Sequence, residues 1–284
     1  MTVAVAIGLV LLTSGCSFIE APVLNPKGPV ALAERDILFR ALAIMMIVVV
    51  PVFVMTFWFA WRYRASRLKA HYEPEWESST LDMATWIVPA LIVASLGVHV
   101  WLSTHALDPY KPLQSSDKPV EIQAVAQDWK WLFIYPNEGI ASVNELAFMS
   151  KAPVSLKITS DTVMNSFYIP ALAGQIYAMA GMQTRLNLSA SEPGRFVGRN
   201  TQYSGRGFAD QHFIAIAKTP AEFENWVTQV RQSPQKLDAA TYAALAKPSA
   251  AHPVTYYSGV EPGLFDAIIR KYDGSLNRRK AAAN

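Results

Sequence analysis

Two long apolar stretches constrain this chain more than any other feature of its sequence. Residues 41–61 and 84–103 contain no Asp, Glu, Lys or Arg. A helix of about 20 residues is about 30 Å long, which matches the hydrocarbon core of a bilayer. A soluble domain would have to bury the whole circumference of each helix. Tryptophans near the ends of both stretches are typical of a membrane interface. We therefore predict a two-helix transmembrane hairpin.

The basic residues between the two spans predict how the hairpin is oriented. Arg62, Arg64, Arg67 and Lys69 all follow closely after the first span. Basic residues gather in the cytoplasmic loops of membrane proteins. The connection between the spans is therefore expected in the cytoplasm. Both flanking parts of the chain are then extracytoplasmic, including everything from about residue 109 onward.

The N-terminal segment has the pattern of a bacterial lipoprotein signal. Residues 3–12 are apolar but too short to span a bilayer, and small residues stand directly before Cys16. We predict a signal peptide over residues 1–15 and acylation, as with palmitate, of Cys16. Residues 16–108 then form a lipid-anchored N-terminus followed by the hairpin. The alternative is an uncleaved apolar tail with an inert thiol.

Beyond the second span the pattern changes to short runs with the character of β-strands. Residues 120–126 alternate apolar and polar side chains, and Gly, Pro, Asn and Asp separate the runs that follow. The further strands are expected at 131–135, 143–148, 154–159, 166–169, 183–188, 195–197 and 212–217. This spacing is typical of an antiparallel β-sandwich or barrel. We predict one such domain over residues 109–218.

The last part of the chain, residues 219–284, is predicted to be a helical segment rich in aromatic residues. Thr219, Pro220 and Glu222 supply a helix cap, a proline in the first turn and a capping-box glutamate. Two further short amphipathic pieces follow at 239–246 and 262–272. We expect their aromatic side chains to pack onto the sandwich or onto a partner, in preference to binding a cofactor.

The composition excludes several kinds of site. Cys16 is the only cysteine, so an internal disulfide and a site with several thiolates are both excluded. The five histidines are dispersed along the chain and form no closely spaced pair. The net charge of +3 gives no reason to expect nucleic acid as a partner.

Four short segments together resemble subunit II of the haem–copper terminal oxidases. They are residues 128–136 (DWKWLFIYP), 161–170 (DTVMNSFYIP), 178–184 (AMAGMQT) and 192–194 (EPG). With two spans in front of them, the resemblance covers nearly the whole chain after Cys16. It implies that the outer β domain has a cupredoxin-like fold.

The same resemblance indicates that the copper site of this family is missing. In the cytochrome c oxidase branch, a histidine and a later C-x-E-x-C-x-x-x-H-x-x-M loop hold a binuclear copper centre, for which soft thiolate ligands are suited. Here the aligned loop is residues 203–214 (YSGRGFADQHFI). The six ligand positions are occupied by Asn165, Tyr203, Gly205, Gly207, Gln211 and Ile214. His212 is one residue out of register and is expected to be a surface or structural histidine.

A subunit II without this centre resembles the quinol oxidase branch, of the cytochrome bo ubiquinol oxidase type. The resemblance implies a chain with no cofactor of its own, in a complex that oxidises ubiquinol, reduces oxygen to water and pumps protons. Haem b, haem o and copper would be in subunit I, and the other partners would be subunits III and IV and membrane lipid. Cytochrome c would not be a partner. The location implied is the bacterial inner membrane, as a multi-pass protein with its large domain in the periplasm.

One residue of this chain has a chemical role implied by the family. Asp82 lies at the cytoplasmic start of the second span, near where a carboxylate is implicated in delivering protons to subunit I. A carboxylate at such a place can collect protons from water. The alternative is an exposed aspartate that stabilises the start of a helix through its dipole.

Two other functions stay open at this point. The chain could be a lipid-anchored cupredoxin-like binding or assembly protein outside any oxidase, although two close spans are more than a tether requires. A copper-bearing cytochrome c oxidase subunit is a third possibility, but it needs thiolates that the chain lacks.

Overall fold

The computed structural model describes residues 21–64, 77–113 and 118–272. Cys16 and the predicted signal peptide lie outside these residues. The chain divides into two compact units, of which one is Glu34–Asp108 and the other combines Met1–Ala33 with Pro109–Asn284. Within the second unit, Lys27 N donates to Ala171 O at 2.7 Å and Ser191 N donates to Lys27 O at 2.8 Å. The segment that leads into the first helix is therefore bound to the outer domain.

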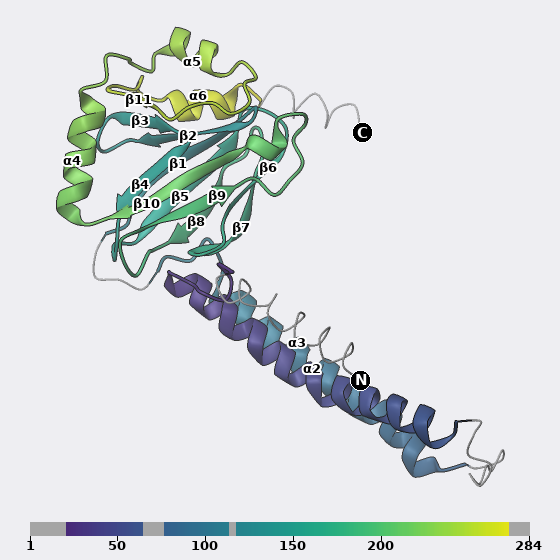
Figure 1. Ribbon diagram of the computed structural model, residues 1–284. Coiled ribbons are helices and arrows are strands. Elements are labelled where there is room, and N and C mark those ends of the chain that lie inside the picture. Colours follow the sequence, from purple (N-terminus) through teal and green to yellow (C-terminus); the bar gives the residue numbers. More distant parts are fainter. Residues whose placement is uncertain (1–20, 65–76, 114–117, 273–284) are drawn as a thin grey trace, which may run out of the picture. The chain divides into compact units, whose positions relative to one another are not determined.

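The first unit is built from two helices that are long and apolar enough to cross a membrane. They are α2 (Pro29–Arg62) and α3 (Ser79–Ala106), drawn as the long helices in Figure 1. Each contains one internal proline, Pro51 or Pro89. Both predicted spans are confirmed as helices. Helix α2 begins well before residue 41, because the charged positions before that residue interrupt the apolar pattern without breaking the helix.

The outer unit is a sandwich of two β-sheets, which confirms the predicted cupredoxin-like fold class (Figure 1). The strand order is β11-β3-β2-β1-β5-β8 in the first sheet and β4-β10-β9-β6-β7 in the second. The strands of the first sheet are β1 (Val120–Gln127), β2 (Lys130–Tyr135), β3 (Ile140–Val143), β5 (Val154–Ser160), β8 (Thr184–Leu188) and β11 (Thr255–Tyr257). Those of the second are β4 (Glu145–Met149), β6 (Asn165–Ile169), β7 (Ala173–Ala178), β9 (Gly194–Arg199) and β10 (His212–Lys218).

Three details of the sandwich differ from the sequence-based expectation. Strand β1 pairs with β5, and β4 with β10, in parallel, so the sheets are not wholly antiparallel. The single strand expected at 143–148 is wrong, because the chain turns at Asn144 (φ 58) and passes from one sheet to the other. The amide of Asn144 accepts from Trp131 N at 2.9 Å and donates to His252 O at 2.7 Å, which fixes this turn. Strands β7 and β11 were not expected.

Aromatic side chains fill the space between the two sheets. Trp131 and Phe133 come from β2, Phe167 from β6 and Phe213 from β10, and all four are buried. The Phe167 and Phe213 rings stack with centroids 5.0 Å apart, and Trp131 meets Phe167 edge-on at 5.2 Å. Buried aromatic pairs of this geometry stabilise a core beyond the area that they bury. Strand β6, which begins at Asn165, and strand β10, which begins directly after Gln211, are thereby joined through side chains in the core.

The C-terminal part forms three helices and strand β11, which is the edge strand of the first sheet (Figure 1). The helices are α4 (Pro220–Arg231), α5 (Ala239–Leu245) and α6 (Leu264–Arg270). The predicted capping box of α4 is confirmed, since Thr219 N donates to Glu222 Oε2 at 2.9 Å and Glu222 N donates to Thr219 Oγ1 at 3.4 Å.

Apolar burial explains why this C-terminal part is so aromatic. Tyr242, Leu245, Tyr257, Leu264, Phe265 and Ile268 form one buried cluster with residues of β1, β2 and β3. Helix α4 buries Trp226 and its neighbours against the main core of the sandwich. The expectation that the aromatic side chains pack onto the sandwich is therefore confirmed.

Candidate functional site

A buried network of amide groups joins two of the six positions that the family resemblance aligns with copper ligands. The centre of the network is Asn200, which follows strand β9. Its Nδ2 donates to Asn165 Oδ1 at 2.7 Å and to Gln211 Oε1 at 2.9 Å. Its Oδ1 accepts from the backbone N–H groups of Ser166 at 2.8 Å and Gln202 at 3.0 Å. One side chain thus connects β6, the end of β9 and the start of β10.

The other members of the network are neutral groups that complete the hydrogen bonding. Ser204 Oγ donates to Gln211 Oε1 at 2.8 Å. Gln211 Nε2 donates to the carbonyl of Gln127 at 3.3 Å, and Asn165 Nδ2 donates to the carbonyl of Val163 at 2.8 Å. Asn165, Asn200, Ser204 and Gln211 are all buried. Buried polar groups that are fully paired make a structure specific and rigid.

The remaining ligand positions lie around this network but do not join it. Tyr203 is 72% exposed and packs against Phe208, with ring centroids 5.7 Å apart. Gly205 has φ +108, and a Cβ on Gly207 would lie only 2.4 Å from the Trp129 ring. The indole of Trp129 therefore occupies the space where side chains at this loop would point. Ile214 is half-buried on β10.

This donor set does not fit a copper centre of the family type. Copper in electron-transfer sites is held by thiolate, imidazole and thioether ligands. The side chains gathered here offer amides and a hydroxyl, and their polar atoms are bonded to one another. Within the described ranges, no group of three or more His, Cys, Asp and Glu residues is placed to hold a metal ion. His212 is exposed on β10.

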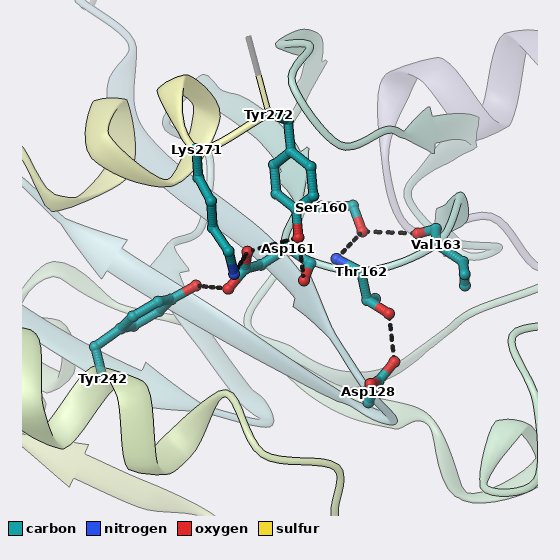
Figure 2. A network of polar contacts seen from close by, with 8 residues as sticks. All are labelled: Asp128, Ser160, Asp161, Thr162, Val163, Tyr242, Lys271 and Tyr272. Carbon is teal, nitrogen blue, oxygen red and sulfur yellow. Dashed lines mark hydrogen bonds and ion pairs between the residues drawn. The ribbon is translucent and has the colours of Figure 1, made fainter. Parts of the chain in front are cut away.

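Next to the amide network, a buried carboxylate ties the C-terminal part to the sandwich (Figure 2). The Asp161 side chain follows β5 and is 1% exposed. Its carboxylate accepts from Tyr242 Oη at 2.7 Å, Tyr272 Oη at 2.9 Å and Lys271 Nζ at 2.7 Å. The Asp161 bonds raise the pKa values of Tyr242 and Tyr272 further, beyond the increase that burial causes. In the adjoining turn, Thr162 Oγ1 donates to Asp128.

Two more buried charges anchor the C-terminal part in the same way. Glu145, on β4, accepts from Trp226 Nε1 at 2.8 Å and from Tyr256 Oη at 2.7 Å. Lys130, on β2, donates to the carbonyl of Lys247 and to Ser249 Oγ, both at 2.8 Å. Burial lowers the pKa of Lys130, and nearby Asp128 offsets part of that effect. A buried charge is tolerated only when it is paired or hydrogen-bonded, so the bound C-terminal segment is needed for each of these groups.

Asp82 lies apart from these networks, in the first turn of α3. It is exposed, and its backbone N–H donates to the carbonyl of the helix cap Ser78 at 3.0 Å. The Asp82 side chain makes no hydrogen bond or ion pair with the residues that the structure describes. This exposed position allows both roles considered for it, proton uptake and stabilisation of the helix start.

Comparison with known proteins gives the class of the chain and then its family. The family model described as the COX Aromatic Rich Motif matches residues 231–274, which include most of the hydrogen-bond partners of Asp161, Glu145 and Lys130. Cytochrome bo(3) ubiquinol oxidase subunit 2 of Pseudomonas putida is 51% identical over 269 residues, covering 94% of this chain and 84% of that protein. Ubiquinol oxidase subunit 2 of Acetobacter aceti is 48% identical over 269 residues, covering 94% and 86%.

Among solved structures, the chain is similar to the periplasmic domain of subunit II of cytochrome oxidase from Bradyrhizobium japonicum. It is 23% identical, covers 40% of this chain and 96% of that chain, and has a TM-score of 0.38. The sequence relatives establish the family: this chain belongs to the ubiquinol oxidase subunit 2 family.

Sequence reasoning missed the residues on which the site is centred. Asn200 lies outside the aligned ligand loop and carries no motif of its own. In the sequence, nothing distinguishes Asp161, Glu145 and Lys130 from ordinary polar residues of strands and turns. The available signal was weak: charged residues within or beside otherwise apolar strands, followed by a tyrosine-rich C-terminal segment that could supply partners.

We predict that Asn200→Ala destabilises the outer domain by about 2–4 kcal/mol, because several buried partners lose their hydrogen bonds at once. The measurement is denaturant unfolding of the full chain in detergent, together with limited proteolysis of the loop at residues 201–211. Arg206→Ala, at an exposed position of the same loop, is the control. Equal stability and equal cleavage of the two variants would contradict a central role for Asn200.

We also predict that the outer domain loses stability at alkaline pH. Burial, together with the hydrogen bond to Glu145, raises the pKa of Tyr256 to about 12. An unfolded tyrosine has a pKa of about 10. Because the folded value is the higher one, the contribution is complete below about pH 10 and is lost as the pH rises through about 12.

The test compares the free energy of unfolding at about pH 9 and about pH 11, on either side of the unfolded tyrosine pKa. The parent chain should lose more stability over this interval than Tyr256→Phe, while exposed Tyr203→Phe should follow the parent. Identical pH slopes for the parent and Tyr256→Phe would show that Tyr256 does not titrate as described.

Proposed function

We propose that this chain is the structural second subunit of a proton-pumping ubiquinol oxidase and carries no redox centre of its own. The observation that supports the proposal is the buried network of Asn165, Asn200, Ser204 and Gln211. Two of its neutral groups, Asn165 and Gln211, stand at positions where the copper-bearing branch of the family has metal ligands. An outer domain without copper cannot receive electrons from a soluble donor such as cytochrome c. Ubiquinol is soluble in lipid and can deliver electrons within the membrane, so the outer relay is not needed.

The remaining components of the proposal concern partners and location. Haem b, haem o and copper belong to subunit I in this account, with subunits III and IV completing the complex. The chain crosses the bacterial inner membrane twice through α2 and α3, with the sandwich in the periplasm. Cys16, after removal of residues 1–15, carries lipid and adds a second attachment to the membrane.

The role of this chain is therefore to hold the other subunits of the complex in position. The spans provide apolar surface for neighbouring helices, and the side chains of their central segments are unburied within this chain. The aromatic core and the amide network hold the outer domain in a fixed conformation, and they do so without a bound ligand. Asp82, exposed at the start of α3, is the group proposed to collect protons for subunit I.

We predict that purification through a tag on this chain recovers a haem-bearing partner and ubiquinol oxidase activity. The measurements are an optical spectrum, metal analysis and oxygen consumption with ubiquinol and with reduced cytochrome c. Activity with ubiquinol alone is expected. A chain that purifies alone and folded would support the alternative, a lipid-anchored binding or assembly protein, and would overturn the proposal.

A second prediction concerns Asp82. In the purified complex, Asp82→Asn should lower oxygen reduction and proton uptake severalfold, because the amide cannot exchange protons at neutral pH. Glu77→Gln removes the same charge two positions before the start of α3 and is the control. Unchanged turnover and proton uptake in Asp82→Asn would leave Asp82 with only a role at the helix start.

A further inference from the structure

One turn of the outer domain takes part in two groups of polar contacts. Residues 160–165 run from the last residue of β5 to the first residue of β6. Near its start, the Asp161 carboxylate accepts hydrogen bonds from the C-terminal part, and Figure 2 shows the donors pointing toward it: Tyr242, Lys271 and Tyr272. These four residues are the Asp161 cluster. At its end, Asn165 belongs to the amide network.

Hydrogen bonds inside the turn connect its two ends. Ser160 Oγ donates to the carbonyl of Val163 at 2.8 Å. Asn165 Nδ2 donates to the same carbonyl at 2.8 Å and to Ser160 Oγ at 3.4 Å. The backbone carbonyl of Asp161 accepts from Tyr272 Oη at 2.8 Å, so the C-terminal part holds the backbone of the turn as well as its carboxylate. A displacement of Asp161 would therefore move the groups that position the amide of Asn165.

A second connection runs through the end of β1. The backbone N–H of Asp161 donates to the carbonyl of Ala126 at 2.8 Å. The carbonyl of the next residue, Gln127, accepts from Gln211 Nε2 at 3.3 Å. Asn165 and Gln211, the two outer members of the amide network, are thus both bonded to backbone that the Asp161 cluster holds in place.

The turn between β1 and β2 repeats this arrangement. Trp129 has φ 66, which a bulky residue adopts only where its surroundings enforce it. Its Nε1 donates to the carbonyl of Ser204, which is a member of the amide network, at 3.1 Å. The next residue, Lys130, donates through Nζ to the carbonyl of Lys247 in the C-terminal part at 2.8 Å. Two turns of the sandwich are therefore bonded to the C-terminal part on one side and to the amide network on the other.

We propose that residues 239–272 act as a clamp on the end of the sandwich that carries the amide network, and that the Asp161 cluster closes this clamp. The closed clamp holds both turns, and through them it holds Asn165 and Gln211 within hydrogen-bonding distance of Asn200. Opening the Asp161 cluster loosens the amide network, and loosening the network weakens the cluster, because coupling between two sites is reciprocal. The clamp lies wholly within the outer domain, so it does not depend on the proposed function.

The test is hydrogen–deuterium exchange of the full chain in detergent, measured by mass spectrometry on peptides that cover residues 165–167 and 200–204. These peptides contain the backbone N–H groups of Ser166 and Gln202, which both donate to Asn200 Oδ1. Tyr272→Phe removes one hydroxyl from the Asp161 cluster. Tyr256→Phe is the matched control, because it removes a hydroxyl from another buried carboxylate, Glu145.

We expect these amides to exchange about tenfold faster in Tyr272→Phe than in the parent, the effect of one hydrogen bond to a buried charge. Tyr256→Phe should leave them at the parent rate. Lys271→Gln, which removes the exposed ammonium of the same cluster, should change the same peptides in the same direction.

The reverse measurement follows exchange over residues 264–272. It should rise severalfold in Asn200→Ala and stay at the parent rate in Arg206→Ala, since coupling acts in both directions. Parent-like exchange of the network peptides in both Tyr272→Phe and Lys271→Gln would overturn the proposal. So would equal acceleration in Tyr272→Phe and Tyr256→Phe, since the cause would then be a general loss of stability.

Discussion

The hydrogen bonds of Asn200 are the interaction on which the outer domain most depends. Its amide joins Asn165 on β6 to Gln211 before β10 and also accepts from two backbone N–H groups. The start of β6, the end of β9 and the start of β10 belong to different parts of the chain, so they need an interaction that holds them together. A metal ion would do this through soft ligands, but here neutral amides do it through hydrogen bonds. The side chains of the network bond to one another and to nearby backbone groups, and Trp129 fills the space beside Gly207.

The C-terminal aromatic segment depends on a second set of buried interactions. Asp161, Glu145 and Lys130 are charged groups from three different parts of the sandwich, and each has its hydrogen-bond partners in residues 226–272. Removing one partner would leave an uncompensated buried charge, which costs far more than an exposed one. Burial of the apolar cluster stabilises the C-terminal segment on the sandwich. The hydrogen bonds of the three buried charges fix the position in which the segment binds. The matched motif of aromatic residues is therefore a cover for the first sheet.

Local patterns predicted the regular elements well. The stretches without charged residues correctly predicted both long helices, and the alternation of apolar and polar residues predicted most of the strands. Thr219 and Glu222 correctly predicted the start of α4. Where prediction failed, the cause was a long-range contact. The single strand expected at 143–148 breaks at Asn144, whose amide bonds Trp131 and His252. Asn200 and Asn165 are 35 residues apart in sequence, so no spacing rule could pair them. The ligand positions were found only by resemblance, and just two of the six, Asn165 and Gln211, meet in one network.

The central proposal is that hydrogen bonds stand, in a cupredoxin-like scaffold, at positions where the copper-bearing branch of the family has metal ligands. Copper titration of the complete purified oxidase tests this most directly, with electron paramagnetic resonance and visible absorption used to separate copper in the outer domain from any copper elsewhere in the complex. The account predicts that added copper produces no thiolate-to-copper absorption band. It also predicts that the copper spin signal is the same in the parent, in Asn165→Ala and in Gln211→Ala. A stoichiometric copper signal that disappears in these two variants would contradict it.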